Sequence, residues 1–153
     1  MMHIPYVHCF IYKDLQFLML RRNTPPFQHM WNCVGGKIMP GETPHDAVVR
    51  EVKEETGLTL QSVQFKGIAT WNQVGGMYIF VAEAGNEDLI AGPEGALAWK
   101  SKSWILQSSD VAPSIPIILE DVLTVDIPVE FMLFYSGMAY EGDIINYIIR
   151  SLD

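Results

Sequence analysis

One short stretch in the first third of the chain carries the signals of both ends of an α-helix. Thr43 offers a side-chain oxygen for an N-cap, and Pro44 suits the first helical position, where the backbone N–H has no intrahelical partner. Asp46 stands where a capping box has its acidic residue, and Gly57 suits the left-handed position after the last turn. We therefore predict a helix over residues 44–56.

The predicted helix has an apolar face and an acidic face. The apolar strip, which would pack on a sheet, consists of Ala47, Val48 and Val52. Glu51, Glu54 and Glu55 are three and four residues apart and share the other face, although such like-charge pairs each destabilise a helix by roughly 0.2–0.5 kcal/mol. A solvated helix face is one interpretation. A bound Mg²⁺ is the other, since Mg²⁺ prefers carboxylate oxygens and shares its remaining positions with phosphates and water.

The spacing of residues 36–58, "GKIMPGETPHDAVVREVKEETGL", favours the metal site. Gly36 is followed after five residues by Glu42, and seven further residues lead to the adjacent Arg50 and Glu51. An aliphatic residue, any residue, two glutamates, any residue, a glycine and an aliphatic residue complete the pattern. This resembles the Nudix box at every specified position, so the chain is similar to the Nudix hydrolases.

Strands are predicted on both sides of this motif. Apolar, β-branched and aromatic segments predict a hairpin around Lys13-Asp14 and two strands joined through Gly75-Gly76. Another short apolar stretch is broken by Gly35-Gly36, where the backbone can approach a ligand or turn sharply. "ALAW" is a further candidate strand, and "SWILQ" begins a short helix or turn. A helix is expected from about Pro116, followed by a strand in "VEFMLFYSGM". The last stretch, "GDIINYIIRSL", fits a short helix or the return arm of a hairpin, and its β-branched residues favour the hairpin.

The alternation of strands and helices predicts an α/β fold with a mixed sheet. The resemblance implies a Nudix-type α/β/α sandwich in which the box forms a loop-helix-loop catalytic motif. We expect a single domain over residues 1–153, with the box at 36–58 and a C-terminal extension from about 126 to 153. This extension would cover a sheet edge, form a homodimer contact or shape the nucleotide pocket.

The resemblance also implies a chemistry. It assigns Glu51, Glu54, Glu55 and a carbonyl of the glycine pair, that of Gly36, as ligands of Mg²⁺, with Mn²⁺ as a substitute. Arg50 and Glu42 would orient these ligands. Glu94, in a loop well beyond the box, would be an extra ligand or the general base. The expected catalytic residues are thus Glu51, Glu54, Arg50 and Glu94.

The chain looks most like the MutT-type nucleoside triphosphate pyrophosphohydrolases, in which paired arginines end a strand before the box. Arg22, of the pair Arg21-Arg22, and Lys37 would contact phosphates, and Ser114 stands where a base-reading asparagine would begin the late helix. Val34 replaces a proline that often precedes the double glycine. Five aromatic residues are candidates for stacking on a base or for core packing: Trp31, Trp71, Tyr78, Phe80 and Trp99.

We therefore expect a hydrolase that cleaves a (deoxy)nucleoside triphosphate to the monophosphate and pyrophosphate, with 8-oxo-dGTP as one candidate substrate. The alternatives are a nucleoside diphosphate sugar, a dinucleoside polyphosphate or a capped RNA end as substrate, or a Nudix module that senses a nucleotide without cleaving it. Modules of that kind commonly lose carboxylates of the box, whereas this chain retains them all.

Composition restricts the partners and the compartment. The formal net charge of −8 at pH 7 argues against binding along a long nucleic acid, which requires a basic surface. No apolar run is long enough to cross a bilayer, and the N-terminal residues do not resemble a signal peptide. Cys9 and Cys33 have neither a disulfide framework nor metal-ligand spacing. We expect buried thiols in a cytoplasmic protein.

Overall fold

The computed structural model describes residues 2–152, within which nine strands form one sheet. The strands are β1 (His3–Lys13), β2 (Gln16–Arg22), β3 (Trp31–Asn32), β4 (Val34–Lys37), β5 (Gln64–Trp71), β6 (Gly75–Glu83), β7 (Gly95–Ser101), β8 (Val129–Tyr135) and β9 (Ile144–Ser151). The helices are α1 (Pro44–Thr56), α2 (Lys102–Gln107) and α3 (Ser114–Thr124).

The sheet is mixed, as the sequence predicted. Its main path runs β3-β2-β1-β6-β5-β8-β9, while β4 pairs with β1 and β7 pairs with β2. The pairs β1–β6 and β5–β8 are parallel, and the other pairs are antiparallel. Strand β1 is therefore hydrogen-bonded to β2, β4 and β6, and this places the glycine-containing strand β4 near the middle of the molecule.

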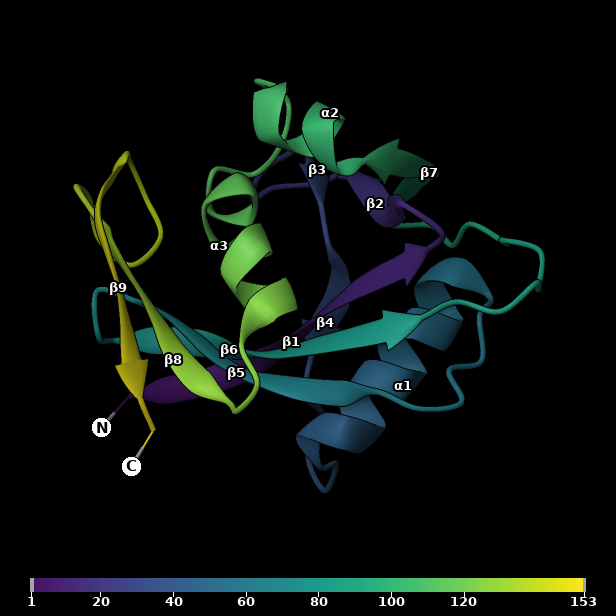
Figure 1. Cartoon of the computed structure of the whole chain (residues 1–153), viewed down its shortest axis with the longest axis horizontal. Coiled ribbons are helices and arrows are strands. Elements are labelled where there is room, and N and C mark those ends of the chain that lie inside the picture. Colours follow the sequence, from purple (N-terminus) through teal and green to yellow (C-terminus); the bar gives the residue numbers. More distant parts are fainter. Residues whose placement is uncertain (1, 153) are drawn as a thin grey trace.

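Helices cover the two faces of this sheet, α1 on one side and α3 on the other (Figure 1). Alternate residues of β1 pack into the cores on the two sides of the sheet, because successive side chains of a strand point to opposite faces. Val7, Cys9 and Ile11 pack in the core under α1, whereas Phe10 belongs to the core under α3. The α/β/α sandwich is thus confirmed.

Helix α1 has the ends that its sequence predicted. The Thr43 side chain accepts a hydrogen bond from the Asp46 backbone N–H at 3.1 Å, and Gly57 adopts a φ of 80°. Lys53 Nζ donates to the Gly57 carbonyl, which lies at the negative end of the helix. Local interactions therefore mark both ends of this helix, and the backbone N–H groups of Ile90 and Gly92 also donate to carbonyls of its last turn.

The late helix begins earlier than predicted. Helix α3 starts at Ser114 and not near Pro116, which is its third residue. A proline is tolerated there because the first N–H groups of a helix have no intrahelical partner. The short segment "SWILQ" was predicted to begin a helix or a turn, and it is helical, as part of α2.

Both glycine pairs lie inside strands. The predicted connection at Gly75-Gly76 was therefore wrong, and of the two roles predicted for Gly35-Gly36 the sharp turn is not formed. Gly35-Gly36 belongs to β4, and Gly75-Gly76 opens β6, so that residues 72–74 make the turn after β5. A Cβ on Gly75 would lie 2.6 Å from Trp71 Nε1. At that position glycine permits close packing, and no turn conformation is needed.

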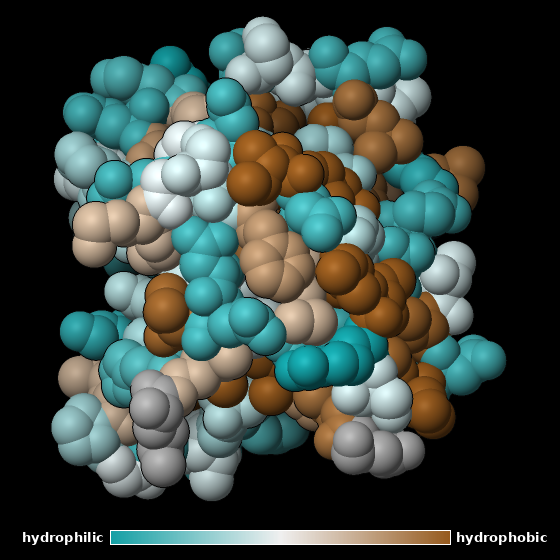
Figure 2. Space-filling model, turned by 90° about the vertical axis from the view of Figure 1, so that its left-hand side faces the viewer, coloured by the Kyte–Doolittle hydropathy of each residue, from teal (hydrophilic) through white to brown (hydrophobic). Residues whose placement is uncertain are grey.

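The C-terminal segment forms the predicted hairpin. Strand β9 pairs antiparallel with β8 and is the last strand of the sheet. Figure 2 looks onto this end of the molecule, where hydrophobic side chains are interspersed with hydrophilic ones. The exposed apolar residues of β9 are Ile145, Ile148 and Ile149. A homodimer remains a prediction.

Two further expectations concern the cysteines and the membrane. Cys9 and Cys33 are both buried free thiols. Burial raises the pKa of each thiol well above its usual range, so both stay protonated at neutral pH. Across residues 2–152, no helix combines the length and the apolar character needed to cross a membrane. The cytoplasmic location remains a prediction.

Candidate active site

Three carboxylates converge beside the glycine pair of β4. Glu51 and Glu55 come from α1 and are buried, whereas Glu94 comes from the loop just before β7. One oxygen from each of the three lies within 4.8 Å of the others. Glu55 also accepts a hydrogen bond from the Gly35 N–H at 2.9 Å, which fixes it against the strand.

The glycines make this close approach of helix and strand sterically feasible. A Cβ on Gly36 would overlap the Glu51 carboxyl group, and a Cβ on Gly35 would overlap the Val7 carbonyl. Any larger residue at either position would push the α1 carboxylates away from β4 or separate β4 from β1. The first glycine of the box therefore has a steric role that its spacing alone did not reveal.

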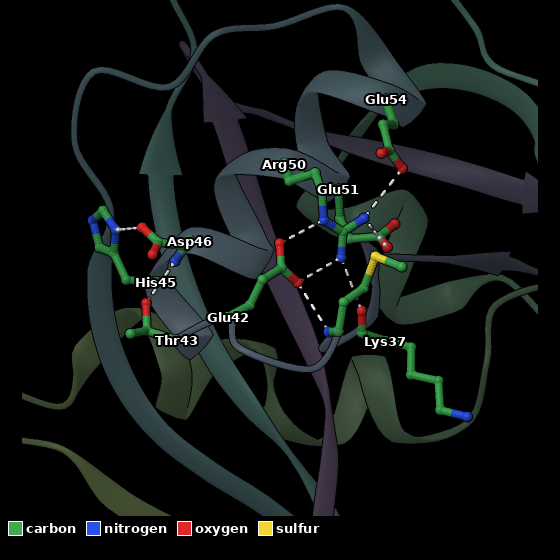
Figure 3. A network of polar contacts seen from close by, with 9 residues as sticks. Lys37, Glu42, Thr43, His45, Asp46, Arg50, Glu51 and Glu54 are labelled. Atoms are coloured by element: carbon green, nitrogen blue, oxygen red, sulfur yellow. Dashed lines mark hydrogen bonds and ion pairs between the residues drawn. The ribbon is translucent and has the colours of Figure 1, made fainter.

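Arg50 ties the carboxylates of the box together (Figure 3). Its Nε and Nη2 donate to the two Glu42 oxygens at 2.6 and 2.9 Å, and its Nη1 donates to Glu51 at 2.9 Å. Nη2 also donates to the Lys37 carbonyl at 3.0 Å. The planar guanidinium thus links the loop before α1 to the helix, and it orients Glu51.

Glu42 holds this guanidinium from the loop side. The hydrogen bonds from Arg50, followed by one from the Met39 N–H, lower the pKa of Glu42 to about 2. Arg50 in turn has its pKa raised further above an already high value, chiefly by Glu42. This pair stays ionised at every pH at which the protein would work, which suits an orienting role.

Glu54 and Lys37 lie further from the cluster. Glu54 accepts a hydrogen bond from Arg50 Nη1 at 3.3 Å, and 59% of its side chain is exposed. The Lys37 side chain points away from the carboxylates in Figure 3. Of the three helix glutamates, the structure therefore brings Glu51 and Glu55 together with Glu94, and Glu54 stands outside this group.

The cluster has the electrostatics of a cation site. Burial raises the pKa of Glu51, although the hydrogen bond from Arg50 acts in the opposite direction. Burial and a hydrogen bond with Glu94 raise the pKa of Glu55 well above its usual range. Without a cation, these carboxyls must retain protons or repel one another. The donor set, two buried carboxyl groups on α1 and the exposed carboxyl group of Glu94 in the loop before β7, fits a hard divalent cation.

A cavity of about 410 Å³ adjoins the cluster. Gly35, Gly36, Glu55 and Glu94 line its charged end. Arg22 and Ser114, predicted to contact the substrate, also line it, whereas Lys37 does not. Ser114 is hydrogen-bonded to Tyr135, another residue of the wall. Both Arg22 and Ser114 are thus placed where a bound molecule would lie.

Among the five candidate aromatic residues, only Trp71 lines this cavity. Tyr78, Phe80 and Trp99 pack in or against the core under α1, on the opposite face of the sheet. Trp31 lies edge-on to Trp104 beneath the Lys100 ammonium group. For these four residues the core-packing interpretation is correct.

Sequence reasoning missed most residues of the cavity wall, among them Tyr6, His8, Phe27 and Tyr140. Alternation along β1 could have indicated the first two, because Tyr6 and His8 share the face opposite Val7. Phe27 and Tyr140 lie in loops, and their positions depend on pairings between distant segments.

The comparisons with known proteins agree with this geometry. The sequence model of the NUDIX domain matches residues 2–107, which is more than half of the chain. The protein belongs to the Nudix family. It is also 31% identical over 115 residues to the Nudix hydrolase YvcI of Bacillus subtilis, covering 69% of this chain and 70% of that relative. A shorter match, 48% identical over 48 residues, covers 31% of this chain and 28% of an ADP-ribose pyrophosphatase of Methanocaldococcus jannaschii.

Solved Nudix structures share the whole fold. The mutator MutT protein of Bacillus halodurans has a TM-score of 0.77 at 25% identity, covering 94% of this chain and 95% of its own. The Nudix domain of Shewanella oneidensis NrtR, solved with ADP ribose, has a TM-score of 0.68 at 16% identity, covering 81% of this chain and 90% of its own. The first likeness includes the C-terminal part of the chain, beyond residue 107, where the family match ends.

The protein is therefore a Nudix hydrolase that acts on the pyrophosphate bond of nucleoside diphosphate-linked substrates, in a family that generally uses a divalent metal. Such an ion, when bound, polarises phosphoryl oxygens and lowers the pKa of an attacking water. Glu51, Glu55 and Glu94 would hold the ion. The hydrogen bond from Arg50 fixes the orientation of the Glu51 carboxyl group.

Proposed function

We propose that this Nudix hydrolase cleaves (deoxy)nucleoside triphosphates to the monophosphate and pyrophosphate with Mg²⁺, for which Mn²⁺ can substitute. The observation that carries the proposal is one cavity in which the carboxylates Glu55 and Glu94 are continuous with aromatic side chains. A single nucleotide has the matching parts, an anionic phosphate chain and a flat base. The near-complete structural likeness to a mutator MutT protein supports the same class.

The proposal assigns roles to the residues of the site. Glu51, Glu55 and Glu94 hold the cation with the Gly36 carbonyl, and Arg50 positions Glu51. Glu54, exposed at the rim, would hold a second ion or activate the attacking water. Two residues of the cavity wall would contact the nucleotide: Arg22 its phosphates and Ser114 its base. Lys37 has no part in this assignment, since its side chain points away.

A second candidate substrate is a nucleoside diphosphate linked to a sugar. The similarity to an ADP-ribose pyrophosphatase and to a Nudix domain solved with ADP ribose favours it. Both matches are short or distant, so this candidate stands second. A nucleotide-sensing module without activity is disfavoured because every carboxylate of the box is retained.

A substrate panel tests the proposal. Nucleoside triphosphates including 8-oxo-dGTP, sugar nucleotides and dinucleoside polyphosphates are incubated with the protein and Mg²⁺ or Mn²⁺, and the products are resolved by chromatography. Release of pyrophosphate from triphosphates is the expected result. Activity confined to diphosphate-linked compounds would overturn the triphosphate assignment, and inactivity across the panel would favour the sensing module.

Matched variants separate catalysis from folding. Glu54→Gln, Glu55→Gln and Glu94→Gln each remove one carboxylate charge without changing the shape of the side chain. Each should lower kcat at least 100-fold, a loss of roughly 3 kcal/mol in transition-state stabilisation. Glu83→Gln, at the exposed end of β6, is the control and should retain full activity. Full activity in Glu94→Gln would remove this loop residue from the site.

A further inference from the structure

The cavity has an aromatic end opposite in character to its carboxylates. Four of its aromatic residues come from different segments: Tyr6 in β1, Phe27 in the loop after β2, Trp71 at the end of β5 and Tyr140 in the loop between β8 and β9. Their rings form a continuous series. Tyr140 lies edge-on to Trp71 at 5.0 Å between centroids and is tilted against Phe27 at 6.1 Å, while Trp71 lies 6.2 Å from Tyr6.

Tyr140 is the member of this series contributed by the C-terminal hairpin. It lies beyond residue 107, where the match to the NUDIX domain ends. The two partly buried rings that it touches come from segments inside that match. The hairpin loop therefore adds to the cavity an aromatic wall that is not part of the matched Nudix sequence.

The loop that carries Tyr140 is closed by its own hydrogen bonds. The Ser136 N–H donates to the Asp143 carbonyl at 2.8 Å, and the Gly137 N–H donates to the Glu141 carbonyl at 3.0 Å. The Asp143 N–H donates to Ser136 Oγ at 2.9 Å. These bonds hold the loop in one shape, which determines where the Tyr140 ring lies.

Asn72, next to Trp71, ties this loop to the turn after β5. Its Oδ1 accepts a hydrogen bond from the Tyr135 N–H at 2.6 Å, and its Nδ2 donates to the Gly137 carbonyl at 2.9 Å. Its backbone N–H donates to the Leu133 carbonyl at 2.9 Å. The Asn72 side chain thus links the turn next to Trp71 to Tyr135 at the end of β8 and to Gly137 in the loop that carries Tyr140.

The cavity wall also includes a histidine with one buried ring nitrogen. The Nδ1 atom of His8 is completely buried at the cavity and has no hydrogen-bond partner within residues 2–152. His8 pairs with Gly35, and it is two residues from Tyr6 on the same face of β1, about 7 Å along the strand. It therefore lies between the aromatic end and the carboxylate end.

We propose that Tyr140 is a specificity-determining residue, whose ring, with Trp71, packs against the heteroaromatic base of the substrate. This inference rests on the proposed function, because it concerns the nucleotide that occupies the same cavity. Asn72 acts as a positioning residue for Tyr140. The C-terminal hairpin then selects substrates that carry a flat base, while the carboxylate end binds the phosphates through the cation.

Steady-state kinetics on the full chain test this inference with two substrates that share a phosphate chain. One is a nucleoside triphosphate cleaved by the parent protein, and the other is inorganic tripolyphosphate, which has no base. Tyr140→Ala should raise KM for the nucleotide roughly ten-fold or more, as expected for the loss of one base–aromatic contact, with kcat changed little. KM or the inhibition constant of tripolyphosphate should stay within about two-fold of the parent value.

Three further variants separate recognition from folding. Tyr140→Phe keeps the ring and should restore the parent KM, whereas Asn72→Ala should raise KM in the same direction as Tyr140→Ala. Met138→Ala, an exposed residue of the same loop, should leave both constants unchanged. Thermal unfolding curves of all variants show whether any KM change accompanies a loss of folded protein.

The outcomes judge the inference and the proposed function separately. An unchanged nucleotide KM in Tyr140→Ala, or an equal weakening for tripolyphosphate, overturns the role of Tyr140. If the parent cleaves only diphosphate-linked nucleotides, the triphosphate assignment fails. The effect of Tyr140→Ala on KM is then measured with the cleaved nucleotide and compared with its effect on binding of inorganic pyrophosphate. If the parent neither cleaves nor binds any nucleotide, both proposals are wrong.

Discussion

The carboxyl group of Glu51 lies where the side chain of any residue larger than glycine at position 36 would begin. Gly36→Ala should therefore displace Glu51 from the cation site. We expect at least a ten-fold loss of metal-dependent activity and a loss of about 1–3 kcal/mol in the free energy of unfolding, as for other overpacked sites. Activity measured against Mg²⁺ concentration and urea unfolding check this. Gly85→Ala, where a Cβ meets no atom within 4 Å, is the matched control.

Arg50 bonds two oxygens of Glu42 and one of Glu51 through a planar fork that lysine cannot reproduce. Arg50→Lys should lower kcat at least ten-fold and the free energy of unfolding by roughly 1–3 kcal/mol, since charge-assisted hydrogen bonds to a buried carboxylate are lost. Arg21→Lys, at an exposed position of β2, should change neither quantity. Parent-like kinetics in Arg50→Lys would show that charge alone suffices at this position.

Removal of divalent cations should destabilise the protein through the crowded carboxyls Glu51, Glu55 and Glu94. At Mg²⁺ concentrations about 100-fold above the dissociation constant, the parent should gain about 2.7 kcal/mol over the chelated protein. Glu55→Gln retains an oxygen for the Gly35 N–H but removes a charge. It should unfold at a higher temperature than the parent in chelator and gain less from Mg²⁺. Calorimetry with and without chelator measures both, and equal gains would contradict the cation site.

Acid should destabilise the fold through His8. Burial, with the nearby Arg22 charge, lowers the pKa of His8 to about 4. Between pH 6.5 and about 4 the unfolded chain therefore binds a proton that the folded protein does not, and stability falls as the pH falls. The loss from this residue approaches about 3 kcal/mol at the lower end of that window. Above about pH 6.5, His8 is neutral in both states and causes no loss in the free energy of unfolding.

Denaturant unfolding at several pH values measures this dependence. In His8→Gln the free energy of unfolding should decline less steeply than in the parent over the same window. His45→Gln, whose parent side chain is 64% exposed, should follow the parent curve. Parallel curves for the parent and His8→Gln would show that His8 has the same pKa in the folded and the unfolded protein.

Local signals explain what the sequence could predict. The ends of α1 follow from Thr43, Pro44 and Gly57, whose effects act within a turn of the helix. The box spacing identified the charged end of the cavity because its residues are near neighbours on α1 and β4. Arg22 and Ser114 were indicated by resemblance alone, and the structure places both at the cavity.

Long-range pairing explains what the sequence could not predict. The resemblance indicated Glu94, but its place beside Glu55 depends on the pairing of β7 with β2, which brings the loop before β7 beside α1; the Gly92 N–H donates to the Glu55 carbonyl. The aromatic end depends on the parallel pairing of β5 with β8, which sets Trp71 opposite Leu133 and the hairpin loop above it. The pair Gly75-Gly76 was misassigned because a glycine needed for close packing looks the same in a sequence as one needed for a turn.

The order of segments along the chain has a consequence for protein synthesis. A ribosome releases the residues of the acidic cluster before it has made β8 and β9. Until β8 arrives, the edge of β5 that will pair with it is open, and an open edge can pair with another chain. Substitutions that slow the docking of this hairpin should therefore reduce the yield of soluble protein in cells. They would do so even where each molecule that completes folding remains fully active.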